Sequence, residues 1–145
     1  MDTAAVLSRL LGPLRRAVLR SVRTAAGLPD LPEAQIELLR VLVADGPLSP
    51  REVAARLHVA PSTVSNLVKA VAVAGLVDRS PDPGNLRTVR LDATPTASDL
   101  LNRYDHTSRA ALSRVIDELS EQDRATLEAA LPVLAKLTTS LDGSA

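Results

Sequence analysis

The sequence predicts a mainly α-helical fold with one small β-hairpin, and three observations support this prediction. Apolar residues recur at spacings of three and four over most of the chain, as on the buried face of an amphipathic helix. Only residues 76–91 show the pattern of a hairpin, with two short strand-like segments on either side of a turn rich in Pro, Gly, Asp and Asn. The aromatic content is 1%, so the core is built from Leu, Val, Ile and Ala, which suits packed helices better than a β-sandwich.

The composition bounds the class of protein. The 145 residues suffice for one domain with a core, and the absence of Cys excludes disulfides, thiolate metal sites and a cysteine redox switch. No apolar run reaches the roughly 18 residues of a membrane span, and the start lacks the basic region of a signal peptide. We therefore expect a soluble, cytoplasmic protein that does not bind a membrane.

The formal net charge is zero, but the charges are unevenly distributed. Residues 49–91 carry six basic and three acidic side chains and lie between two acidic blocks, 28–48 and 92–145. A modestly basic segment of this kind is compatible with a local surface that faces DNA.

Six helices are predicted from the apolar periodicity and from residues that start or stop helices. The Gly-Pro pair at 12–13 predicts a kink or break in the first helix, and Pro132 predicts a bend in the last one. The run Ser-Pro-Arg-Glu at 49–52 predicts a capped helix start with a capping box, and Ser120 predicts a second cap. The expected ranges are 3–26, 32–44, 50–57, 61–74, 97–119 and 120–141.

Between the fourth and fifth helices, residues 76–80 and 88–91 are expected to pair as strands around a five-residue tip, 81–85. The order of short helix, tight turn, second helix and hairpin is typical of a winged helix-turn-helix. Ala54 supplies the small residue where the two helices cross, and Val59 supplies an apolar residue in the turn. We expect Val64 and Leu67 to anchor the second helix.

With those positions buried, the opposite face of the second helix carries short hydroxyls, an amide and one cation, which can reach base edges or phosphates. The free N–H groups at the start of this helix also favour a phosphate. A solvated polar face on an ordinary helix pair is the alternative, and the hairpin that follows favours DNA. The polar residues are Ser62, Thr63, Ser65, Asn66 and Lys69.

Residues 32–141 resemble the MarR family of winged helix regulators. The resemblance lies in the stretch from Glu52 to Val68, then in Ala74-Gly-Leu-Val-Asp-Arg, Asp82-Pro-Gly-Asn-Leu-Arg and Thr94-Pro. It implies a homodimer held by the first and the last two helices, with recognition helices in successive major grooves and wings at the flanking minor grooves. It also implies release from DNA when a small, often phenolic, effector binds between the dimer and DNA-binding regions.

The resemblance has departures. The family's wing usually reads Asp-x-Arg at its tip, whereas this chain has Asn85-Leu86-Arg87. Arg87 keeps a cation that can enter a narrow minor groove, and Asn85 can orient it by a hydrogen bond. Asn66 and Ala70 stand where the family often has Arg, so the DNA face is less basic than usual, which Lys69 partly offsets. His58 stands where positive φ is often needed, and His tolerates that region better than most residues.

The sequence therefore predicts one MarR-like domain over 1–145, with dimerisation helices in 1–31 and 97–145 and the winged helix-turn-helix in 32–96. The function predicted is sequence-specific binding to a pseudo-palindromic operator in double-stranded DNA, as a homodimeric repressor released by an effector. The alternative is a winged helix protein-interaction module without DNA binding. The predicted DNA contacts are Pro61, Ser62, Thr63, Ser65, Asn66, Lys69, Asn85 and Arg87.

No catalytic constellation, cofactor site or metal site is expected. His58 and His106 are far apart in sequence and lack further ligands at metal spacing, and no Gly-x-Ser-x-Gly elbow or Gly-rich phosphate loop occurs. Tyr104 is the only aromatic residue. We expect it to pack among the dimer helices, and a place in a ligand pocket is the alternative.

Overall fold

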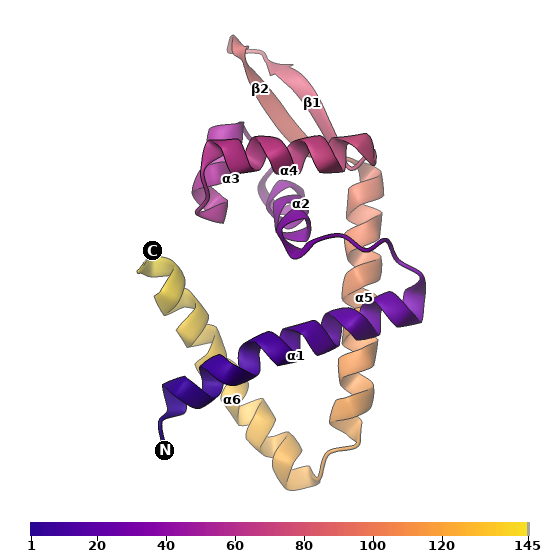
Figure 1. The fold of residues 1–145 in the computed structure, drawn as a ribbon, viewed down its shortest axis with the longest axis vertical. Helices are drawn as coiled ribbons and strands as arrows, with labels where there is room; N and C mark the ends of the chain where they lie inside the picture. The colour runs from indigo at the N-terminus through magenta and orange to yellow at the C-terminus, as the bar shows by residue number, and fades with distance from the viewer. Residues whose placement is uncertain (145) are drawn as a thin grey trace. The chain divides into compact units, whose positions relative to one another are not determined.

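The computed structural model of the chain describes residues 1–144, without the side chains of residues 25 and 26 (Figure 1). Their contacts divide them into two compact units, one of residues 26–106 and one of residues 1–25 and 107–144. The elements are α1 (Thr3–Ala26), α2 (Glu33–Asp45), α3 (Pro50–Leu57), α4 (Pro61–Val73), β1 (Val77–Asp82), β2 (Asn85–Ala93), α5 (Pro95–Asp117) and α6 (Glu121–Gly143). The mainly helical fold with a two-stranded wing confirms the predicted fold class.

The unit of residues 26–106 has a core of aliphatic side chains from α2, α3, α4, the hairpin and the first turns of α5. On α2 the buried residues are Ile36, Leu38, Leu39 and Leu42, whereas Val43 is exposed. The apolar spacing in the sequence predicts one face with Ile36, Leu39 and Val43. The first two are buried as expected, but Val43 is not, because the buried side of α2 is rotated toward Leu38 and Leu42. This unit holds the helix-turn-helix and the hairpin.

The start of α3 is the capping box that the sequence predicts. The Ser49 side chain accepts a hydrogen bond from the Glu52 N–H, and the Glu52 carboxylate accepts one from the Ser49 N–H. These hydrogen bonds hold the pKa of Glu52 below its usual value, with the backbone N–H of Ser49 as the largest cause. At the other end His58 adopts φ 55 and ψ 43, the left-handed conformation expected there.

Two expected anchors of the helix-turn-helix are less buried than predicted. Val59 in the turn is 37% exposed, and Leu67 on α4 is only half-buried. The other expected anchor of α4, Val64, is buried as predicted, together with Val68 and Val71 at spacings of four and three. The sequence pattern therefore identified the buried face of α4, on which Leu67 lies at the edge.

The hairpin is longer and its turn tighter than predicted. β1 and β2 pair antiparallel from Val77 opposite Ala93 to Asp82 opposite Asn85, with a register irregularity between Pro81 and Asp82. Only residues 83–84 form the turn, so the expected five-residue tip is wrong. The strands extend into the Pro-rich stretch because a bulge accommodates residues that a regular ladder would not.

The linker between α2 and α3 ties the hairpin to the helices. Leu48 and Leu91 exchange backbone hydrogen bonds of 2.9 and 2.7 Å, which adds an isolated bridge beside β2. Gly46, just before it, has no room for a side chain, because a Cβ there would meet the Leu42 carbonyl oxygen and the Asp92 carboxylate. The close approach at Gly46 fixes how the linker leaves α2.

The first turns of α5 are held within the same unit by three contacts. The Thr94 hydroxyl donates to the Gly75 carbonyl (2.8 Å) and accepts from the Ala97 N–H (3.2 Å), so Thr94 caps the helix. Arg40 on α2 makes a bidentate ion pair with Asp105, at 2.7 and 3.1 Å, whose hydrogen bonds raise the pKa of Arg40 above its usual value. The Tyr104 hydroxyl donates to the Pro29 carbonyl.

Tyr104 is therefore a core residue of the helix-turn-helix unit. Its side chain is buried, and both it and Pro29 belong to residues 26–106. Tyr104 lies on α5 and its partner Pro29 lies in residues 1–31, so both belong to the segments that the sequence analysis assigns to dimerisation. A place for Tyr104 in a ligand pocket stays a prediction. The periodicity identified the apolar face of α5 but could not show which neighbour covers its first half.

The second unit consists of α1, the end of α5 and α6. α1 and α6 each run without a break through their internal prolines, Pro13 and Pro132. Of the kink or break expected in α1, the break is therefore not observed. α6 has no buried residue, although Ser120 caps it as predicted. Its exposed apolar side chains are Leu131, Val133, Leu134, Leu137 and Leu141, and those of α1 are Leu10, Leu11 and Leu14.

Tyr104→Phe should lower the free energy of unfolding by about 1–2 kcal/mol, because the Pro29 carbonyl would lose its partner in a part-buried place. Urea denaturation at fixed protein concentration measures the change. Ser113→Ala, which removes an exposed hydroxyl from the same helix, should change it by less than about 0.5 kcal/mol. Equal effects of the two variants would show that the Tyr104 hydrogen bond contributes nothing to stability.

Candidate nucleic-acid interface

The exposed face of α4 carries all six residues that the sequence places there. The buried valines of α4 point into the unit, and this leaves the opposite side of the helix in contact with solvent. Its hydroxyls, amide and ammonium are short or flexible groups that suit base edges and phosphates. The exposed residues are Pro61, Ser62, Thr63, Ser65, Asn66 and Lys69.

The N-terminus of α4 has a helix-dipole charge, and neither its cap residue nor its first turn supplies an acidic side chain to neutralise it. The cap residue is Ala60, which makes no side-chain hydrogen bond, and Pro61 occupies the first turn. The Ser65 hydroxyl donates to the Pro61 carbonyl at 3.3 Å, so it presents its acceptor lone pairs outward. This end of the helix has the positive partial charge that attracts a phosphate.

The tip of the hairpin is ordered by two side chains of its own. Asp82 accepts from the Gly84 N–H at 2.9 Å, and Asn85 accepts from the Arg87 N–H at 3.1 Å. The predicted hydrogen bond between Asn85 and Arg87 is thus present, at the Arg87 backbone. Leu86 is 82% exposed, and Asn85 and Arg87 are exposed as well. The wing therefore presents a cation next to a rigid turn.

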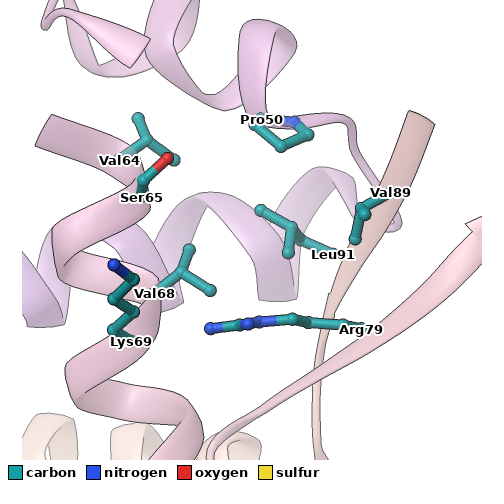
Figure 2. Close-up of a pocket in the computed structure, with 8 residues that line it drawn as sticks. All are labelled: Pro50, Val64, Ser65, Val68, Lys69, Arg79, Val89 and Leu91. Carbon is teal, nitrogen blue, oxygen red and sulfur yellow. The ribbon is translucent and has the colours of Figure 1, made fainter. Parts of the chain in front are cut away.

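A pocket of about 200 Å³ lies between α4 and the wing (Figure 2). Its apolar lining comes from α3, α4 and β2, and two cations lie at its edges, Lys69 on α4 and Arg79 on β1. In Figure 2 the Arg79 side chain reaches from the wing across the pocket toward α4. The lining residues are Pro50, Val64, Ser65, Val68, Lys69, Arg79, Val89 and Leu91.

Arg79 is a candidate contact that sequence reasoning missed. The predicted strand 76–80 already contained it, but the pairing register was unknown. In the structure Arg79 is the cross-strand partner of the buried Leu91, which places it on the face of the wing that faces α4. The alternation of buried and exposed residues in β2, continued across the hairpin, was the signal that could have found it.

No other chemistry stands out in the described part of the chain. Within residues 1–144, no cluster of three or more His, Asp or Glu side chains is arranged to hold a metal ion. Of the helices described, none combines the length and apolar character needed to cross a bilayer.

Comparison with known proteins agrees with this geometry. Residues 27–88, which run from before α2 into the wing, match the MarR family model. The chain is 32% identical over 90 residues to YdgG, an uncharacterized HTH-type transcriptional regulator of Bacillus subtilis. That match covers 61% of this chain and 59% of the relative. An HTH-type transcriptional regulator of Mycobacterium tuberculosis is 26% identical over 90% of this chain and 93% of its own.

Solved structures share the fold over nearly the whole chain. A MarR family protein of Bacillus stearothermophilus has a TM-score of 0.72 at 23% identity, covering 94% of this chain and 96% of its own. FabT of Streptococcus pneumoniae, solved in complex with DNA, has a TM-score of 0.72 at 18% identity over 97% and 99% of the two chains. PcaV of Streptomyces coelicolor, solved with its natural ligand, has a TM-score of 0.64 at 20% identity over 93% of each.

The family match covers the helix-turn-helix and most of the wing, where the exposed polar face of α4 and the ordered hairpin tip lie. The solved structures extend the same fold through the terminal helices. Over residues 27–88 the chain matches the MarR family, and over its length it has the fold of solved MarR family structures.

Proposed function

We propose that this protein is a homodimeric repressor that binds a pseudo-palindromic operator in double-stranded DNA. The observation that carries the proposal is the exposed polar face of α4, held beside an ordered cationic wing within one unit. FabT, which has this fold, is solved in complex with DNA. The contacts proposed are Pro61, Ser62, Thr63, Ser65, Asn66, Lys69, Asn85 and Arg87.

The two elements would read DNA in different ways. The exposed face of α4 fits the major groove, where an amide such as that of Asn66 can pair with adenine. The wing would place Arg87 at the flanking minor groove, where a cation gains from the negative potential whatever the major-groove sequence. Two copies related by a two-fold axis require two half-sites of opposite orientation, which is a pseudo-palindrome.

The dimer is proposed to form through the unit of α1 and α6. The apolar side chains of α6 named above are 38–71% exposed in the single chain, and α1 adds three exposed leucines. Contiguous apolar surface of this kind on a single chain marks an interface. A two-fold symmetric pairing would bury the same stripe on both copies.

The remaining parts of the proposal concern regulation. A small effector, of phenolic type, would lower the affinity for DNA. PcaV, a transcriptional regulator with this fold, is solved in complex with its natural ligand, which supports a ligand site in such a fold. We propose a cytoplasmic protein without catalytic activity, since its relatives are transcriptional regulators. The alternative function is a protein-interaction module without DNA binding. The small number of basic side chains on α4 favours this alternative.

The first test measures binding of the protein to the intergenic DNA upstream of its own gene. Fluorescence anisotropy gives the affinity at each salt concentration of a series. The expected result is tighter binding to that DNA than to a scrambled duplex, with affinity that falls as salt rises. A chain that binds neither duplex at low salt would favour the protein-interaction module.

Asn66→Ala and Arg87→Ala should separate the two reading elements. Asn66→Ala should reduce the difference in binding free energy between the operator and the scrambled duplex by roughly 1–3 kcal/mol, because it removes a base contact. Arg87→Ala should weaken binding to both duplexes more evenly. It should also flatten the slope of log affinity against log salt concentration by about one unit per protomer. Affinities at several salt concentrations measure both effects. If Arg87→Ala left affinity and slope unchanged, the wing would not contact DNA.

The unaltered chain should have twice the 15.3 kDa chain mass in dilute solution, as measured by light scattering. The double variant Leu134→Glu and Leu137→Glu should shift it toward monomer, since two charges would enter the apolar stripe of α6. Lys136→Glu, an equal addition of negative charge on the polar side of α6, should stay dimeric. A monomer mass for the unaltered chain would contradict the proposed dimer.

A further inference from the structure

The pocket between α4 and the wing holds two positive charges and no negative one. Lys69 and Arg79 lie at its edges, and no acidic side chain belongs to its described lining. The rest of the lining, apart from Ser65, is Pro, Val and Leu, which offers the two cations no acceptor. Two positive charges beside the same apolar pocket repel one another. An anion bound between the Lys69 ammonium and the Arg79 guanidinium would reduce this repulsion.

Two acids of the wing, Asp78 and Asp92, lie on its other face. Neighbouring residues of a strand point to opposite sides, and Arg79 pairs with Leu91 on the side of α4. Asp78 pairs with Asp92 on the opposite side. Asp92 accepts from the Ala93 N–H at 2.9 Å. The wing is therefore basic toward α4 and acidic away from it.

Another arginine of the wing, Arg90, points the other way. Its cross-strand partner is Ser80, so it has the opposite parity to Arg79 and Leu91 in the regular part of the ladder. Arg90 donates to the Pro47 carbonyl at 3.2 Å and is held by the linker. Arg79 is therefore the arginine that the regular ladder places toward Lys69 and α4.

We propose that Arg79 and Lys69 together hold one backbone phosphate of the DNA strand that separates the major groove from the minor groove. This inference rests on the proposed function. If α4 enters the major groove and the wing the adjacent minor groove, the strand between the two grooves crosses the gap between α4 and β1, which is the place of the pocket. A phosphodiester is the anion that DNA presents there.

The side chains suit a shared phosphate. The Arg79 guanidinium is a planar fork that can donate two hydrogen bonds to two phosphate oxygens, and the Lys69 ammonium is a compact charge that can reach another. The valines and Leu91 beneath them limit the access of water, which strengthens charge-assisted hydrogen bonds. The phosphate would also hold α4 and the wing at a fixed separation.

The experiment compares the unaltered chain with Arg79→Gln, Lys69→Gln and the double variant, by anisotropy with the operator duplex from 50 to 200 mM salt. Gln keeps the aliphatic stem that lines the pocket and removes the charge. Arg103→Gln, an exposed arginine on α5, is the control for loss of one charge. Thermal melting of each variant shows that it is folded.

We expect Arg79→Gln to lower the affinity for operator and scrambled duplex alike, by about tenfold or more at 50 mM salt, and Arg103→Gln to leave both unchanged. Because both cations neutralise one phosphate, the double variant should flatten the salt slope by about 0.9 per protomer. Independent contacts to two phosphates would flatten it by about twice that, which would overturn the shared site.

If the unaltered chain binds DNA and Arg79→Gln binds DNA equally well, the shared phosphate site is wrong and the proposed function stands. If the unaltered chain binds no duplex, the proposed function fails and the shared phosphate site fails with it. A free small anion is the other source of a phosphate group. If inorganic phosphate raised the melting temperature of the unaltered chain but not of Arg79→Gln, while DNA affinity was equal in both, the pocket would be a small-anion site instead.

Discussion

Three buried valines determine which side of α4 the rest of the protein leaves exposed. Each contributes about 1.5–3 kcal/mol when it leaves water, and only one rotation of the helix about its axis buries all three. That rotation turns Asn66 and Lys69 outward. The αL residue His58 and the capping box of α3 then position the helix start, so the orientation of the exposed polar face is set by residues that lie outside it.

The wing depends on the helices in a similar way. A two-stranded hairpin alone is marginally stable in water, and the bridge between Leu48 and Leu91 supplies a third backbone segment beside it. Leu91 is also buried, so the same residue joins the ladder to the core. Because Gly46 leaves no space for a Cβ, the linker before Leu48 follows one path, and the basic face of the wing is held toward α4.

Local signals in the sequence were sufficient where local chemistry decides the structure. The Ser49 cap, the αL turn at His58 and the order of helices and hairpin follow from residues that lie close together along the chain. The exposed residues of α4 followed from apolar periodicity. The hairpin boundaries did not, because proline and glycine suggested a longer loop while a bulge allowed the strands to continue. Arg79 and the partner of Tyr104 depend on register and on contacts across tens of residues, which periodicity does not encode.

The hydrogen bond from Tyr104 to Pro29 has a spectroscopic consequence. With no Trp and no other Tyr, this one phenol gives the protein all of its intrinsic ultraviolet emission. The signal comes from a single buried place in the unit that carries α4 and the wing. Intrinsic fluorescence therefore follows that unit alone, and loosening of α1 or α6 that leaves it intact is silent to this probe. Comparison with circular dichroism, which reports on all the helices, would show whether the two units unfold together.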